Sequence, residues 1–148
     1  MRGGIQNQLT ALGESSCYFL CLCKIAEEAN TQPIDIVNSF DLCVGEKYIR
    51  FNYNKPDDGD NCYIDNPSGI LELLTRKTWS YRRITTQWEI ECWKAGEKEY
   101  TIQRWYRKTT GKEYTHFRRP VWDPLLDSQT VKYGAIDVLY IFTMGEDV

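Results

Sequence analysis

The sequence contains a single histidine, His116, among its 148 residues. A zinc site would have to combine it with cysteines, and the spacing of Cys17, Cys21 and Cys23 matches no common structural zinc motif. A G-x-S-x-G motif is also missing, which leaves a serine nucleophile without support. We therefore expect no metal and no cofactor.

Long apolar runs are scarce as well. No stretch approaches the roughly 20 apolar residues that cross a bilayer, and residues 1–16, MRGGIQNQLTALGESS, lack the apolar centre of a secretory signal. We expect no membrane partner and a cytoplasmic location, where the six cysteines stay reduced. A chain of 148 residues is predicted to form one domain with a core that needs no disulfides.

The net charge of −3 hides a segregation of charge along the chain. Residues 76–119 hold 12 Lys/Arg and 5 Asp/Glu, a charge of +7, whereas the remainder holds 6 and 16, a charge of −10. Alternation in half-buried strands, with the charges facing water, explains this pattern most simply. The alternative is a surface for an acidic or nucleotide ligand, because aromatic residues interleave with the basic ones. These aromatic residues are Trp79, Tyr81, Trp88, Trp93, Tyr100, Trp105, Tyr106 and Tyr114.

Helical patterns fill the first half of the chain. Residues 17–29 follow Ser15 or Ser16, either of which is a good N-cap, and their first two turns are apolar on every side, which predicts a buried helix. Residues 33–44 and 69–76 have the pattern of further helices. The intervening segment 52–61, NYNKPDDGDN, is predicted to be a solvated acidic loop, because the glutamate that an EF-hand calcium site needs is missing.

The second half has strand-like patterns. Residues 79–85, 88–95, 98–109, 114–123 and 134–142 are rich in aromatic and β-branched residues with partial alternation. Hairpin turns are expected at 95–97 and 110–112. Helices followed by an antiparallel sheet predict an α+β fold, with a helical part at 1–78 and a sheet part at 79–148.

Three cysteines lie close together in ESSCYFLCLCKIAEE, residues 14–28. They could fill a core, clip a metal, form a disulfide or include a nucleophile. Cys17 lies at the predicted helix N-terminus, where the macrodipole favours the thiolate. Cys21 and Cys23 lie deeper, where burial raises thiol pKa values, so we expect them to be inert packing residues. A neutral imidazole from another element would complete a catalytic pair with Cys17, although a small buried side chain is the simpler interpretation of that residue.

Two segments share an ordered set of features: QNQLTALGESSCYFLCLCKIAEE at 6–28 and THFRRPVWDPLLDSQTVKYGAIDVLYIF at 115–142. They contain an upstream glutamine, a cysteine that opens an apolar helix, a distant His-Phe, and an Asp-Pro followed by a glycine-led strand. This arrangement resembles the papain-like fold, and within it the C39-like peptidases, which include bacteriocin-precursor processing domains and small bacterial and phage proteins. The resemblance covers about a third of the chain. It implies a cysteine helix packed on the sheet and a thiol hydrolase that acts on a peptide or amide bond, in a bacterial or phage-infected cell.

The resemblance also implies roles for individual residues. Cys17 would be the nucleophile, His116 the general base and Asp123 the residue that orients the imidazole. Gln8 would donate a hydrogen bond to the oxyanion together with the backbone N–H of Cys17, with Gln6 as the alternative donor.

This sequence departs from the family in two places. Ser16 and Tyr18 flank the cysteine where the family usually has glycine, and His116 and Asp123 are only seven residues apart where the family has a long hairpin. In one continuous strand these two residues would lie roughly 23 Å apart.

A tight turn would bring them together. A two-residue loop at Arg119-Pro120 would place His116 opposite Asp123 at about 5 Å between Cβ atoms, and a type VI turn with a cis proline would suit it. Without such a turn, Asp127 or Asp137 would have to orient the imidazole, or no residue would. A second hypothesis is therefore a non-catalytic binding protein on a papain-like scaffold, with the basic aromatic stretch as its ligand surface.

Overall fold

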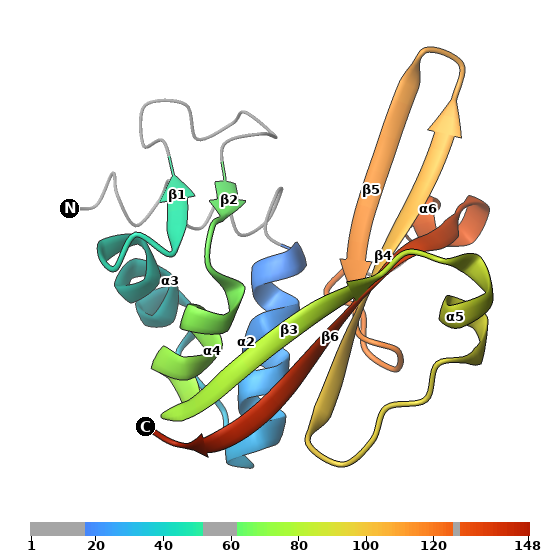
Figure 1. Cartoon of the computed structure of the whole chain (residues 1–148). Coiled ribbons are helices and arrows are strands. Elements are labelled where there is room, and N and C mark those ends of the chain that lie inside the picture. Colours follow the sequence, from blue (N-terminus) through green and yellow to red (C-terminus); the bar gives the residue numbers. More distant parts are fainter. Residues whose placement is uncertain (1–16, 52–61, 126–127) are drawn as a thin grey trace. The chain divides into compact units, whose positions relative to one another are not determined.

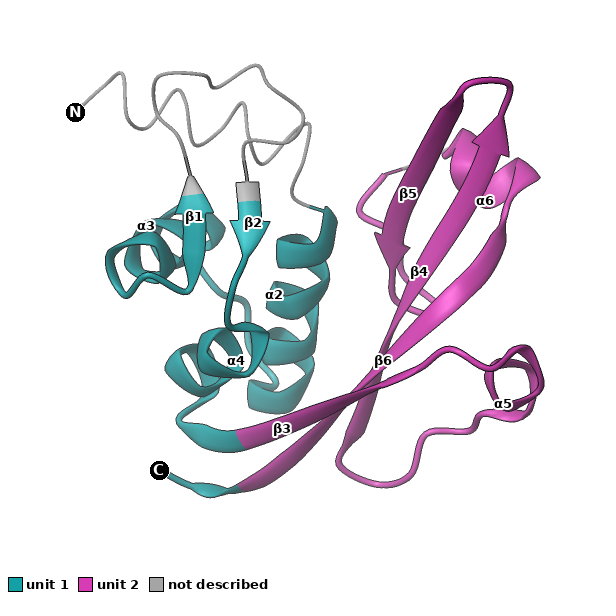
Figure 2. Cartoon of the chain, turned by 45° about the horizontal axis from the view of Figure 1, so that its top comes forward, with its two compact units in different colours: residues 1–78, 146–148 teal, residues 79–145 magenta. Residues whose placement is uncertain are grey.

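Helices precede the sheet along the chain, which is the α+β order that the sequence predicts (Figure 1). The computed structural model describes residues 17–51, 62–125 and 128–148. These divide into two units, residues 1–78 with 146–148, and residues 79–145 (Figure 2). None of the described helices is long and apolar enough to cross a membrane.

The first unit is built on helix α2 (Cys17–Asn30), close to the predicted bounds. Its buried residues include Phe19, and the Phe19 ring lies edge-on to Phe40 of α3 (Ile36–Gly45) at 5.3 Å between centroids. The Asn30 side chain donates to the Leu74 carbonyl of α4 (Pro67–Thr75) at 3.0 Å. The first two turns are not buried on every side, because Tyr18 is only half-buried. A two-stranded antiparallel hairpin completes this unit, formed by β1 (Ile49–Phe51) and β2 (Cys62–Ile64).

Side-chain caps fix where the two later helices begin. Asp35 accepts a hydrogen bond from the Asn38 N–H at 3.0 Å, so α3 begins three residues later than Pro33 suggested. Asn66 accepts one from the Gly69 N–H at 2.9 Å, and Pro67 occupies the first turn of α4, two residues earlier than predicted.

Four antiparallel strands form the sheet in the order β3-β6-β4-β5. They are β3 (Lys77–Ile84), β4 (Glu99–Thr109), β5 (Lys112–Arg118) and β6 (Ala135–Asp147). Thr109 pairs with Lys112 around a two-residue turn in which Gly111 has φ 75°, which confirms the hairpin expected at 110–112.

The segment predicted as a strand at 88–95 forms a helix instead, α5 (Gln87–Cys92). Ile90 and Trp93 are three residues apart, so they point to one side of this turn and pack against sheet residues such as Leu139. Trp88, which strand alternation would place on the same face as Ile90, is 71% exposed. The turn expected at 95–97 therefore connects a helix to β4 rather than two strands. A further short helix, α6 (Gln129–Tyr133), was not predicted.

Candidate active site around His116

His116 is a buried residue on β5, with 5% of its surface exposed. Its Nε2 lies 2.6 Å from Oδ1 of Asp123, whose side chain is 15% exposed. A carboxylate in this position fixes both the orientation of the imidazole and the nitrogen that carries its proton. The His–Asp contact that the tight-turn hypothesis requires is therefore present.

A turn just after β5 makes this contact. The Arg119 N–H donates to the Trp122 carbonyl at 2.8 Å, and the Trp122 N–H donates back to Arg119 at 3.3 Å. The loop is thus Pro120-Val121, one residue later than the predicted Arg119-Pro120. Pro120 occupies the first central position, which suits its fixed φ, and the described peptide bonds are all trans, so the type VI alternative is wrong.

The shifted register changes which residues face each other. With Arg119 opposite Trp122, Asp123 faces Arg118 rather than His116, and Arg118 Nη1 lies 4.0 Å from Asp123 Oδ2. The Asp123 side chain therefore reaches diagonally, two residues along β5 from Arg118, to meet the imidazole.

Asp123 is itself held in place. The Leu125 N–H donates to Asp123 Oδ1 at 2.9 Å, which closes a local turn after the hairpin. Of the alternative carboxylates, Asp137 binds Arg104 instead, at 2.9 and 2.7 Å, beside an irregularity in the pairing of β4 with β6. Asp127 lies outside the described residues.

The other imidazole nitrogen has a different environment. Within residues 17–51, 62–125 and 128–148, no side chain or backbone group hydrogen bonds Nδ1 of His116. When Asp123 is ionised and accepts a hydrogen bond from the Nε2–H group, Nδ1 carries a lone pair and can act as a base. The pair thus has the chemistry of an oriented general base.

Cys17, the predicted nucleophile, is half-exposed at the first residue of α2. It belongs to the first unit and His116 to the second, so their meeting stays a prediction. Gln8 and Gln6, the predicted oxyanion donors, lie outside the described residues, as do the proposed caps Ser15 and Ser16.

The deeper cysteines have the character expected of packing residues. Cys21 and Cys23 are buried thiols. Burial raises the pKa of Cys23 strongly, with smaller contributions from Cys43 and Glu27, as predicted for this position. Burial, followed by the charge of Glu46, raises the pKa of Cys43 to about 12. In the described part of the chain, no group of three or more His, Cys, Asp or Glu side chains could hold a metal ion.

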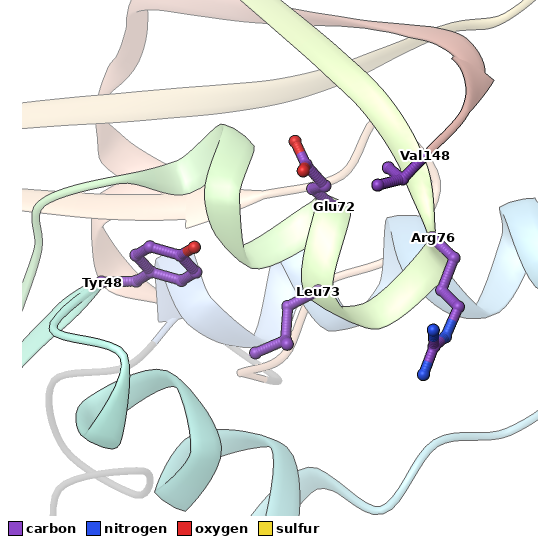
Figure 3. Close-up of a pocket in the computed structure, with 5 residues that line it drawn as sticks. All are labelled: Tyr48, Glu72, Leu73, Arg76 and Val148. Atoms are coloured by element: carbon purple, nitrogen blue, oxygen red, sulfur yellow. The ribbon is translucent and has the colours of Figure 1, made fainter.

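A pocket in the first unit is lined by residues of a different kind from those around His116 (Figure 3). It has a volume of about 260 Å³ and is lined by Tyr48, Glu72, Leu73, Arg76 and Val148. That volume is small for a ligand pocket, and the lining contains no nucleophile or imidazole. It contains none of the residues predicted for catalysis.

Alternation in half-buried strands accounts for only part of the basic aromatic stretch. Trp79 is buried and Trp105 half-buried, as half-buried strands require. Tyr81, Trp88 and Tyr114 are exposed, with 43%, 71% and 36% of their surfaces accessible. The alternation therefore explains some of these rings and leaves others facing water.

Comparison with models of known protein families finds no match, and comparisons with curated proteins and with solved structures find none either. The papain-like resemblance consequently depends on the residues quoted from the sequence.

Proposed function

We propose that this protein is a small papain-like thiol hydrolase that acts on a peptide or amide bond of a peptide or protein substrate. In this proposal α2 packs on the sheet and brings Cys17 to His116. The observation that carries the proposal is the buried His116–Asp123 pair, in which Nε2 is engaged at 2.6 Å and Nδ1 is not hydrogen bonded by any described residue.

The reaction would follow the usual course of a cysteine hydrolase. The Cys17 thiol gives its proton to Nδ1 of His116, and the thiolate attacks the substrate carbonyl carbon. The backbone N–H of Cys17 and the Gln8 side chain stabilise the oxyanion. The imidazolium then protonates the leaving amine, and His116 deprotonates a water molecule that hydrolyses the thioester and regenerates the thiol. Asp123 keeps the imidazole oriented throughout.

Two considerations bear on the substrate and on the type of reaction. A chain of 148 residues has little material for long specificity loops, so a short or flexible substrate segment near a glycine would suit it. Deamidation and acyl transfer would use the same residues, because they share the thioester intermediate.

Acylation by p-nitrophenyl acetate tests the proposal without knowledge of the natural substrate. We expect a burst of p-nitrophenolate and an acetyl group that mass spectrometry maps to Cys17. Cys17→Ser and His116→Ala should abolish the burst. Cys21→Ala is the matched control, because it removes a buried thiol of the same helix; it should keep the burst at a stability cost of about 1 kcal/mol. A burst that survives His116→Ala, or acetylation spread over several cysteines, would exclude the mechanism.

A non-catalytic binding protein is the second candidate. The exposed cations and aromatic rings of the second unit favour it, for example Lys112, whose Nζ lies 5.1 Å from the ring centre of Tyr114. Slow and uniform acetylation of the accessible cysteines would support this candidate over the hydrolase.

A further inference from the structure

Helix α6 lies beside the β4–β5 hairpin (Figures 1 and 2). Two tyrosines and three cations come together there. Arg107 of β4 pairs with Tyr114 of β5, and the Arg107 guanidinium carbon lies 5.5 Å from the ring centres of both Tyr114 and Tyr133. Lys112 Nζ lies 5.1 Å from the Tyr114 ring centre, and Lys132 Nζ lies 5.3 Å from that of Tyr133. We call these five residues the cation–tyrosine cluster.

The positive charge of the cluster is not neutralised locally. Among the residues that the structure describes, none of its three cations has a carboxylate oxygen within 4 Å. Glu113 is next to Lys112 and Tyr114 in the strand, so it points to the opposite face of the hairpin, where its carboxylate accepts from the Tyr106 hydroxyl at 3.0 Å. Three close positive charges without a counter-charge create a field that attracts an anion.

The aromatic rings of the cluster face water as well. Tyr114 is 36% exposed and Tyr133 is 62% exposed. Large aromatic side chains are usually buried in a core, so two exposed rings side by side are available to a ligand. Arg107 bridges the two rings, which holds its guanidinium plane beside them. The surface therefore combines point charges with flat stacking groups.

We propose that the cation–tyrosine cluster binds single-stranded nucleic acid. The three cations contact phosphates, and unpaired bases stack on the tyrosine rings or on the Arg107 plane. A duplex keeps its bases stacked on each other, and an acidic peptide would use the cations while leaving the rings without a role. No residue of the cluster takes part in the hydrolase mechanism, so the two proposals stand independently.

Fluorescence anisotropy with a labelled oligothymidylate tests this binding on the full chain. We expect binding at low salt, and at least roughly tenfold weaker binding of a duplex of the same length. The logarithm of the affinity should fall with the logarithm of salt concentration with a slope of about −2, from three cations at about 0.7 each. Equal affinity for the duplex, or no binding at low salt, would overturn the proposal.

Paired variants locate the surface. Lys112→Gln should weaken binding and reduce the slope by about 0.7, and it should do so more than Lys108→Gln, which removes a charge from the opposite face of the same hairpin. Tyr133→Ala should weaken binding about fivefold or more, whereas Trp88→Ala, which removes an exposed ring on α5, should not. All four positions are exposed, and thermal melting checks that each variant is folded.

Two results would count against the assignment. One is an effect of Lys108→Gln or Trp88→Ala as large as that of its partner variant. The other is displacement of the oligonucleotide by poly-glutamate at the same charge concentration, which would indicate an acidic protein partner instead.

Discussion

At the scale of single residues, the His116 imidazole depends on one carboxylate. Asp123 is the described acceptor on Nε2, and the pair is largely buried. Replacing Asp123 with alanine would leave a buried ring nitrogen without its partner, which costs about 1–3 kcal/mol. The sequence alone could place this contact within reach because seven residues and a proline turn separate the two side chains. It could not fix the register, since a one-residue shift of the loop leaves the local pattern unchanged.

The first prediction concerns this carboxylate. Asp123→Ala should lower the acylation rate of Cys17 at least about tenfold, because the imidazole loses its orientation. Asp123→Asn is the matched control: its amide oxygen can still accept a hydrogen bond from the Nε2–H group, so it should retain more activity than the alanine variant. Burst kinetics measure both rates. Equal rates in wild type and Asp123→Ala would show that His116 needs no orienting partner.

The second prediction concerns the buried thiols and alkaline pH. In the folded protein, burial raises the pKa of Cys43 to about 12, whereas the pKa of an ordinary thiol is near 9. Above about pH 9, Cys43 loses its proton in the unfolded chain but keeps it in the folded protein. The free energy of unfolding is therefore highest below about pH 9 and falls as the pH rises above it. The raised pKa of buried Cys23 lowers the free energy of unfolding at alkaline pH in the same way.

Urea unfolding at about pH 8 and about pH 10 measures this loss, which should reach at most about 1.4 kcal/mol per pH unit for each thiol. Cys43→Ala should be less stable than wild type at the lower pH but should lose less stability between the two values. An equal loss in both proteins would show that Cys43 does not contribute to the alkaline sensitivity.

At the scale of elements, sequence patterns predicted those structures whose signal is local in the sequence. The 17–29 helix and the 110–112 hairpin turn are of this kind, since apolar content defines the first and a glycine with positive φ the second. The strand predicted at 88–95 was wrong, because so short a segment fits both the helical and the strand periodicity. The helix is favoured because it lets Ile90 and Trp93 pack against sheet residues such as Leu139, and Leu139 is far away in the sequence.

The third prediction concerns the junction between α6 and β6. A Cβ built at Gly134 would lie 2.3 Å from the Tyr106 carbonyl oxygen and 2.4 Å from that of Thr130, both of which are backbone atoms. Gly134→Ala should therefore destabilise the protein by about 1–3 kcal/mol, as overpacking does. Gly45→Ala, where a Cβ meets nothing within 4 Å, is the matched control and should be close to neutral. Chemical denaturation compares the two, and equal stabilities would show that the junction can relax.

At the scale of the whole molecule, the α+β order of elements follows from composition, because helical patterns end near residue 78 and strand patterns begin there. The proposed catalytic contact is of another kind. Cys17 and His116 are 99 residues apart and belong to different units. Local propensity cannot bring such residues together, so their pairing was predicted only from the order in which the family features occur along the chain.

Alkylation of Cys17 tests that pairing most directly. Limited iodoacetamide is added at about pH 6.5, below the range in which ordinary thiols ionise, and mass spectrometry measures the rate at each cysteine. Exposed Cys92 is the internal reference, and buried Cys23 should hardly react. If Cys17 and His116 form a thiolate–imidazolium pair, Cys17 reacts several times faster than Cys92, and His116→Ala removes that advantage while leaving the Cys92 rate unchanged. A Cys17 rate equal to that of Cys92, or one that His116→Ala does not alter, would contradict the proposed hydrolase.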